Sequence, residues 1–161
     1  IVALSLQGEI LSSVRLPSSE WHFHCAIYQA QAHVRGVVHT HSPYATALAC
    51  LDRPIPAFHY MVAVAGGDDI PCVPYATFGT DELAAHVVAG LANRSACLLS
   101  HHGQIATGES LAKAYDLAHE VETLAQQYHL ACQVGTPALL DAQEMARVLE
   151  KFKTYGNQPE A

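Results

Sequence analysis

The segment Val37-Val38-His39-Thr40-His41 carries the strongest indication of both fold and chemistry in this chain. Adjacent valines are typical of a buried strand. Side chains alternate along an extended backbone, so His39 and His41 are expected to point to the same side. Ser42-Pro43 follows directly and favours a new helix, because proline is accepted at the first helical position. The pattern predicts two histidines on one face, at the end of a strand.

Two histidines in this arrangement are close enough to share one metal ion. Histidine is the commonest metal ligand in proteins, and this chain has 11 histidines among its 161 residues. The simpler alternative is that two of the 11 histidines are two residues apart by chance. Their position where a strand gives way to a loop favours the metal interpretation.

A second apolar strand also leads to histidines, in Leu98-Leu99-Ser100-His101-His102-Gly103. Neighbours on an extended backbone face opposite sides, so only one of His101 and His102 is expected to join His39 and His41; the geometry leaves open which one. The alternative is that both are exposed turn residues. Three histidines suit zinc, with a fourth position that is open or held by a carboxylate. The candidate carboxylates are Glu20, Asp52, Asp68, Asp69 and Glu120.

Hydropathy and turn signals predict mixed strands and helices without a regular alternation. Strands are expected at residues 1–6, 10–14, 34–39, 60–64, 70–75, 96–100 and 104–106. Helices are expected at residues 20–32, 44–51, 81–91, 110–132 and 141–152, with caps at Ser18 or Ser19, at Thr80 and at Asp141. This pattern favours an α+β fold in which helices cover both faces of a central, mostly antiparallel sheet, a three-layer α/β/α arrangement.

Composition narrows the class of protein. The length suits one compact domain, and half of the residues are hydrophobic. The net charge is −7 and no basic run occurs, so nucleic acid is not an expected partner. No stretch has the roughly 18 consecutive apolar residues of a membrane helix. The five widely spaced cysteines suggest reduced, buried thiols in a cytoplasmic protein. Nucleotide-binding glycine motifs are absent from the sequence.

The motifs, taken in order, closely resemble the class II aldolase/adducin family. They are Leu16-Pro17-Ser18-Ser19-Glu20-Trp21, His39-Thr40-His41, Tyr60, Phe78-Gly79-Thr80 and His101-His102-Gly103, followed by a similar tail at residues 149–156. The resemblance covers residues 1–161 as a single domain of this type and is closest to members that cleave L-fuculose 1-phosphate. It also implies that the family's N-terminal segment, roughly fifty residues, is lacking here.

The resemblance implies a metal site. Its zinc ligands fall on His39, His41 and His102, with Glu20 as a carboxylate ligand that also serves as the catalytic base. The resemblance therefore selects the second histidine of the pair, which the geometry leaves open. One zinc ion per subunit would polarise the substrate carbonyl, and Glu20 would move the proton of the neighbouring carbon.

The resemblance also implies how the substrate is held. Ser18 and Ser19 would bind the substrate phosphate, which suits hydroxyls and amides at the start of a helix. Phe78 would shape the aldehyde pocket. Tyr60 would donate a proton to the aldehyde oxygen, and Tyr155 would reach the site from the C-terminal tail. Without the resemblance, Tyr60 is a half-buried strand aromatic and Tyr155 a tail residue.

The implied function is a zinc-dependent aldehyde-lyase of carbohydrate metabolism. It would reversibly cleave L-fuculose 1-phosphate, or a similar ketose 1-phosphate, to dihydroxyacetone phosphate and L-lactaldehyde in fucose degradation. The family forms homotetramers, in which a neighbour supplies Tyr60 and Tyr155. Alternatives are an L-ribulose-5-phosphate 4-epimerase or another sugar-phosphate enzyme of the family, and a non-catalytic adducin-like module. Glu20 favours the aldolase because the epimerase has Asp there, and the retained ligands speak against the module.

Overall fold

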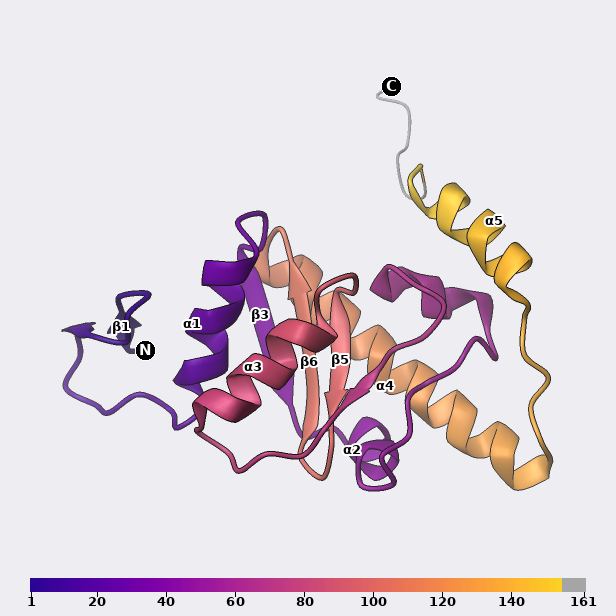
Figure 1. Ribbon diagram of the computed structural model, residues 1–161, viewed down its shortest axis with the longest axis horizontal. Coiled ribbons are helices and arrows are strands. Elements are labelled where there is room, and N and C mark those ends of the chain that lie inside the picture. Colours follow the sequence, from indigo (N-terminus) through magenta and orange to yellow (C-terminus); the bar gives the residue numbers. More distant parts are fainter. Residues whose placement is uncertain (155–161) are drawn as a thin grey trace.

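A four-stranded sheet forms the centre of the computed structural model, which describes residues 1–154 (Figure 1). Its strand order is β3, β6, β5 and β4, with the bounds Gly36–Thr40, Gly103–Gly108, Ala96–Leu99 and Cys72–Val73. The β3–β6 and β5–β6 pairs are antiparallel, and the β4–β5 pair is parallel. The prediction of a mostly antiparallel sheet is confirmed.

The sheet brings the ends of β3 and β5 to one edge. Both strands run antiparallel to β6, so they point in the same direction. Thr40 at the end of β3 pairs with Gln104, and Leu99 at the end of β5 pairs with Gly103. The end of β3 and the turn after β5 therefore meet beside the start of β6. The histidines of the segments 37–41 and 98–103 lie at this edge.

Helices cover both faces of the sheet (Figure 1). Their bounds are Trp21–Ala30 (α1), Pro43–Ala49 (α2), Tyr60–Ala65 (η1, a 3-10 helix), Asp81–Gly90 (α3), Leu111–Val134 (α4) and Ala142–Phe152 (α5). Helices α1 and α3 pack on one face and α2 and α4 on the other, while α5 packs against η1. The predicted three-layer arrangement is confirmed.

The two faces of the sheet have separate hydrophobic cores. On β5, Leu98 belongs to the core under α2 and α4, and Leu99 belongs to the core under α1 and α3. On β6, Ala106 and Ile105 divide in the same way, as expected from the alternation of side chains along a strand. All four side chains are fully buried. The two central strands are therefore packed on both faces and give the edge a rigid base.

The strand predicted at residues 60–64 is wrong, because this segment is η1. A short apolar run does not distinguish a strand from a buried helical turn, and here the flanking residues decide. His59 accepts the backbone N–H of Met61 through Nδ1 at 3.2 Å, and Gly66 ends the helix in the left-handed region at φ 90°. The strand predicted at 70–75 is reduced to β4.

The N-terminal hairpin is present but shorter than predicted, with β1 at Ala3–Leu4 and β2 at Ile10–Ser12 in antiparallel pairing. The caps predicted at Thr80 and Asp141 are confirmed, since their side chains accept the N–H groups of the third helical residues at 3.2 and 2.7 Å. The cap predicted at Ser18 or Ser19 is wrong, because Glu20 is the N-cap of α1 and makes no side-chain capping bond.

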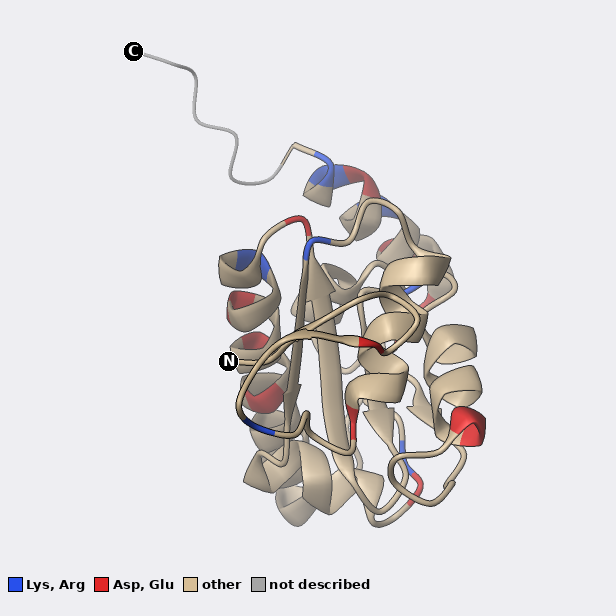
Figure 2. Cartoon of the chain, turned by 90° about the vertical axis from the view of Figure 1, so that its left-hand side faces the viewer, with Lys and Arg blue, Asp and Glu red and all other residues tan. Residues whose placement is uncertain are grey.

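Charged side chains are scattered, and on the side shown in Figure 2 the lysines and arginines do not gather into a stripe. Within residues 1–154, none of the helices combines the length and apolarity needed to cross a bilayer. The five cysteines are free, as predicted. Their predicted burial is wrong for Cys50 and Cys132, which are exposed on or next to helix surfaces, whereas Cys25 and Cys97 are buried.

Candidate metal centre

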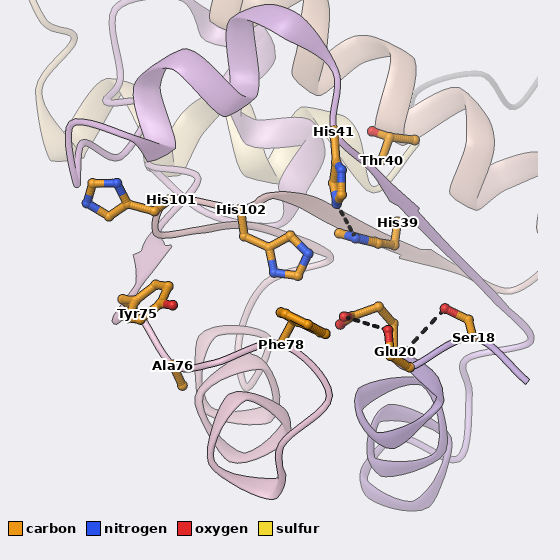
Figure 3. Close-up of a pocket in the computed structure, with 11 residues that line it drawn as sticks. Ser18, Glu20, His39, Thr40, His41, Tyr75, Ala76, Phe78, His101 and His102 are labelled. Atoms are coloured by element: carbon orange, nitrogen blue, oxygen red, sulfur yellow. Dashed lines mark hydrogen bonds between the residues drawn. The ribbon is translucent and has the colours of Figure 1, made fainter.

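Three imidazoles converge at the edge of the sheet where β3 and β5 end. His39 is on β3, His41 follows it, and His102 lies in the turn between β5 and β6. One ligand nitrogen from each ring lies within 4.8 Å of the other two. The ring centroids are 4.8 to 4.9 Å apart, and the rings converge at interplanar angles of 61° to 83° (Figure 3). The three side chains are placed to hold a single cation.

The turn after β5 decides which of the two adjacent histidines joins the cluster. His101 has a φ of 53°, a left-handed conformation that is uncommon for residues other than glycine. The turn directs the ring of His101 away from the other histidines (Figure 3). Its Nε2 lies 4.0 Å from Oδ2 of Asp52. His102 then points inward. The choice left open by strand alternation is made by the backbone of this turn.

A glycine after the pair allows the turn to approach β3. A Cβ atom added to Gly103 would lie 2.4 Å from the carbonyl oxygen of Thr40 and 3.0 Å from Cδ2 of His41. The first distance is shorter than a carbon atom tolerates and involves backbone that cannot move away without disturbing the β3–β6 ladder, and the second is a tight contact. Gly103 therefore permits the close contact that brings His102 to the other two ligands.

Hydrogen bonding and burial keep His39 in the form that binds metals. Its Nδ1 lies 2.9 Å from the carbonyl oxygen of Gln104, to which it donates, so Nε2 presents its lone pair to the cluster. Nε2 lies 3.0 Å from Nε2 of His41. Burial, with the neighbouring histidines, lowers the pKa of His39 to about 4. Burial likewise lowers the pKa of His102.

Glu20 is the carboxylate of this pocket. Its side chain is buried, and it reaches the pocket from the N-terminus of α1 (Figure 3). Ser19 Oγ lies 3.5 Å from Oε1, whereas Oε2 is buried and has no hydrogen-bond partner among the described residues. Glu20 and His102 line the same pocket, and the charge of Glu20 raises the pKa of His102 against the larger effect of burial. A buried carboxylate oxygen without a hydrogen-bond partner in the described chain, in a pocket that three imidazoles also line, suits a cation.

The other candidate carboxylates have different surroundings. Asp68 and Asp69 pair with Arg94, at 2.9 and 2.7 Å. Asp52 accepts a short hydrogen bond from Ser100. Glu120 lines a separate cavity on α4. Sequence spacing did not distinguish these four acidic residues from Glu20, but of the five only Glu20 lines the histidine pocket.

The pocket around the histidines has a volume of about 610 Å³. Ser18, Ser19 and Phe78, all expected at the substrate site, line it, and Figure 3 shows Ser18 and Phe78. The sequence analysis missed Thr40, Tyr75, Ala76 and His101, which also line the pocket. A signal was present for two of them, because Tyr75 and Ala76 shortly precede Phe78 in the same loop.

Tyr60, predicted at the site, is not part of this pocket. Tyr60 is half exposed on η1 and lines another cavity, of about 730 Å³, between η1 and α5. Tyr155 lies outside the described residues.

Three imidazoles are nitrogen donors of the kind that zinc and similar transition metals prefer, whereas magnesium and calcium prefer oxygen ligands alone. Glu20 lines the same pocket but is not among the ligand atoms that lie within 4.8 Å of one another. The residues present thus fit a divalent transition metal.

Comparison with known proteins places this geometry in a family. The family described as "Class II Aldolase and Adducin N-terminal domain" matches residues 1–129. A 5-methylthioribulose-1-phosphate/5-deoxyribulose-1-phosphate aldolase from Rhodospirillum rubrum is 57% identical over 157 residues, which cover 98% of this chain and 71% of that protein. The L-fuculose phosphate aldolase of Escherichia coli K12 is 56% identical over 143 residues, which cover 88% of this chain and 66% of that protein.

A solved structure agrees with the sequence comparison. An L-fuculose 1-phosphate aldolase superposes with a TM-score of 0.90 at 43% identity, over 94% of this chain and 71% of that one. The chain thus spans about two thirds of the length of these relatives, or slightly more. The relatives are aldolases, which are aldehyde-lyases. From the matched fold and the extent of identity, the chain belongs to the class II aldolase and adducin family.

Proposed function

We propose that the chain cleaves a ketose 1-phosphate to dihydroxyacetone phosphate and an aldehyde, with L-fuculose 1-phosphate and its product L-lactaldehyde as one candidate pair. The observation that carries the proposal is a buried carboxylate, Glu20, beside three converging imidazoles in a pocket of about 610 Å³. The alternatives of a sugar-phosphate epimerase and a non-catalytic module predict different outcomes in the experiment below.

A second substrate has equal support from the relatives. Similar identity connects the chain to L-fuculose phosphate aldolases and to aldolases of 5-methylthioribulose 1-phosphate and 5-deoxyribulose 1-phosphate. The loop with Tyr75, Ala76 and Phe78 forms a largely apolar side of the pocket. An apolar side favours an aldehyde fragment that ends in a methyl or thioether group, because a hydroxyl there would lose its hydrogen bonds to water.

The proposed metal ligands are His39, His41, His102 and Glu20, and the proposed metal is zinc, one per subunit. In a tetrahedral site with bonds of about 2.0–2.1 Å, two ligand nitrogens are about 3.3 Å apart. The distance of 3.0 Å between Nε2 of His39 and Nε2 of His41 is close to this value. A divalent metal held there would act as a Lewis acid on the oxygens around the reacting carbons.

The phosphate is expected at the other end of the pocket. Ser18 and Ser19 line the pocket immediately before α1, a helix of ten residues. Their hydroxyls donate to phosphate oxygens, and the start of the helix is favourable for an anion. Ser18 Oγ accepts the N–H of Glu20 at 3.3 Å, so the hydroxyl hydrogen of Ser18 is directed elsewhere. With the phosphate anchored here, the reacting carbons lie between Glu20 and the histidines.

Glu20 is the group that moves the proton on carbon. In cleavage, the hydroxyl on the fourth carbon loses its proton, and the bond between the third and fourth carbons breaks. The electron pair remains with the dihydroxyacetone phosphate fragment, and Glu20 in its acid form returns a proton to the third carbon. In synthesis, the same carboxylate takes that proton away. Burial protects the transfer from water, since Glu20 is 9% exposed.

Tyr60 is proposed to exchange the proton of the aldehyde oxygen, and Tyr155 to close the site. Tyr60 is half exposed and does not line the pocket of its own chain. A tyrosine in this position serves the reaction only if it enters the pocket of another copy. We therefore also propose the homotetramer that the family resemblance implies, with sites at subunit boundaries.

The experiment uses the zinc-loaded protein on L-fuculose 1-phosphate, 5-deoxyribulose 1-phosphate and L-ribulose 5-phosphate. Release of dihydroxyacetone phosphate is followed by its reduction in a coupled assay. We expect cleavage of at least one of the two ketose 1-phosphates. In Glu20→Gln, we expect kcat to fall by about 100-fold or more, because the proton-transfer group is lost. Epimerisation of L-ribulose 5-phosphate without cleavage, or a folded protein that binds no zinc, would contradict the proposal.

A further inference from the structure

Gln104, the second residue of β6, is a buried polar residue whose presence in the core is not explained by packing. It is 1% exposed, and its Nε2 donates to Ser42 Oγ at 2.8 Å and to the carbonyl oxygen of Ala118 at 3.0 Å. Its Oε1 is buried and has no partner among the described residues. A half-satisfied amide in a core is less stabilising than an apolar side chain of the same shape. Its two donated bonds are therefore the feature to explain.

The backbone of Gln104 already belongs to the metal centre. Its carbonyl oxygen accepts the hydrogen bond from Nδ1 of His39. It is two residues after His102, across Gly103, so its backbone continues the turn that delivers this ligand. Two of the three imidazoles are thus connected to Gln104 through its main chain.

The side chain of Gln104 reaches the third imidazole through Ser42, the residue after His41. Ser42 is the N-cap of α2, yet its side chain makes no capping bond. The carboxylate of Glu122 on α4 takes this role, because it accepts the N–H groups of Tyr44 and Ala45 at 2.9 and 2.8 Å. The hydroxyl of Ser42 is therefore available to Gln104.

The position of the His41 ring depends on a fixed backbone more than the positions of the other two imidazoles do. It is exposed, whereas His39 and His102 are partly buried. Burial restricts side-chain movement, so the position of an exposed ring depends mainly on the backbone that carries it. Glu122 holds the segment after His41 from α4, and Gln104 holds it from β6. The Gln104 contact acts on the turn between β3 and α2, and the Glu122 contacts act on the first turn of α2 directly after it.

We propose that the Gln104 amide is a positioning group of the metal centre, which fixes the turn carrying His41 relative to His39 and His102 and so raises the affinity for a divalent cation. The inference rests on the proposed function, because it assumes that the three imidazoles bind a metal. A preorganised set of ligands loses less conformational entropy when the ion binds. Gln104 itself does not touch the ion or the substrate.

The test compares Gln104→Met, an apolar side chain of similar size, with Thr107→Val on the same strand. Thr107 is also buried, and its Oγ1 donates to Ser95, away from the histidines. Zinc affinity is measured by competition with a chromophoric chelator, and the cobalt form is examined by its visible absorption spectrum. We expect Gln104→Met to bind zinc about tenfold more weakly, at the low end of the 10–100-fold range for such outer residues. We also expect an altered cobalt spectrum, with neither change in Thr107→Val.

Ser42→Ala identifies the route of the effect. If Gln104 acts through Ser42, zinc affinity falls similarly in Ser42→Ala and in the double variant, so the two effects are not additive. Ser42→Ala also serves if Gln104→Met does not fold, because it leaves the core intact. If either single variant binds zinc within twofold of the parent protein and has an unchanged cobalt spectrum, the role of Gln104 is overturned, and the proposed function is not affected. A parent protein that binds no zinc would overturn the proposed function as well.

Discussion

His39 and His102 illustrate how burial prepares single side chains for metal binding. Burial lowers the pKa of both, so near neutral pH each presents a nitrogen lone pair without first releasing a proton. In the proposed site, one carboxylate and three imidazoles would not cancel the charge of a divalent cation, so the ion would stay electrophilic toward substrate oxygens.

The adjacent residues His101 and His102 form a matched pair for testing the ligand set. We expect His102→Asn to lose more zinc affinity than the roughly 10–100-fold loss typical of changes outside the ligand shell, because a ligand is removed. We expect His101→Asn to keep the affinity of the parent protein, and asparagine tolerates the left-handed backbone at this position. Zinc titration of both variants checks this. Equal losses in the two variants would show that the turn, not the ring of His102, is what matters.

Cys97 predicts a dependence of stability on pH. Burial, together with Cys72, raises the pKa of Cys97 to about 12 from an ordinary value of 9.0. Above about pH 9 the unfolded chain releases this proton while the folded chain keeps it, so the free energy of unfolding falls as pH rises. We expect Cys97→Val to show a smaller decrease between pH 8 and pH 10 in urea unfolding, with the exposed Cys132→Val as control. A decrease as large as that of the parent protein would contradict this assignment.

At the level of elements, the site depends on three segments that meet at one edge of the sheet. The end of β3, the β5–β6 turn and the start of α1 each contribute ligand candidates. The β3–β6 register places Thr40 opposite Gln104, and with it His39 and His41 beside the turn. A shift of this register by one residue would turn the side chains of β3 to the other face.

Gly103→Ala tests the close approach of the turn to β3. The new Cβ would lie 2.4 Å from the Thr40 carbonyl oxygen, so the turn and the strand must separate. We expect a loss of about 1–3 kcal/mol in the free energy of unfolding, the usual cost of overpacking, together with weaker zinc binding. Urea unfolding and zinc titration measure the two effects. Gly135→Ala is the control, because a Cβ there meets nothing within 4 Å, and a tolerated Gly103→Ala would show that the turn has room to move.

At the scale of the whole molecule, the proposed tyrosine roles require more than one chain. The pocket with Glu20 and the cavity beside Tyr60 have no lining residue in common. Their separation within one chain is compatible with a reaction site only if a neighbour completes it. The central sheet and its two cores give each chain a rigid body on which such a boundary can form.

Mixing two inactive variants tests this arrangement. Glu20→Gln lacks the proposed base and Tyr60→Phe lacks the proposed proton donor, so we expect little activity from either alone. Coexpressed in equal amounts, they should form sites in which an intact Glu20 meets an intact Tyr60 of a neighbour, and random assembly would restore about a quarter of the parent activity. Light scattering should give the mass of a tetramer. No recovery in confirmed mixed oligomers, or a monomeric mass, would contradict the proposal.

Local sequence determined the type and position of most helices and strands, because backbone geometry and capping act over a few residues. The alternation of side chains around His39 and His41, the caps at Thr80 and Asp141 and the layered fold were all predictable. The short apolar run after His59 was not, because helix and strand bury such a run equally well and its flanking contacts decide.

Only the tertiary structure decided which residues meet. The left-handed φ of His101 turns His102 inward, and the fold leaves Glu20 beside the imidazoles while binding Asp68 and Asp69 to Arg94. The hydrogen bond from Gln104 to Ser42 joins residues 62 positions apart. Such choices depend on strand register and helix packing, which arise from the summed contacts of the whole chain and which no short segment specifies by itself.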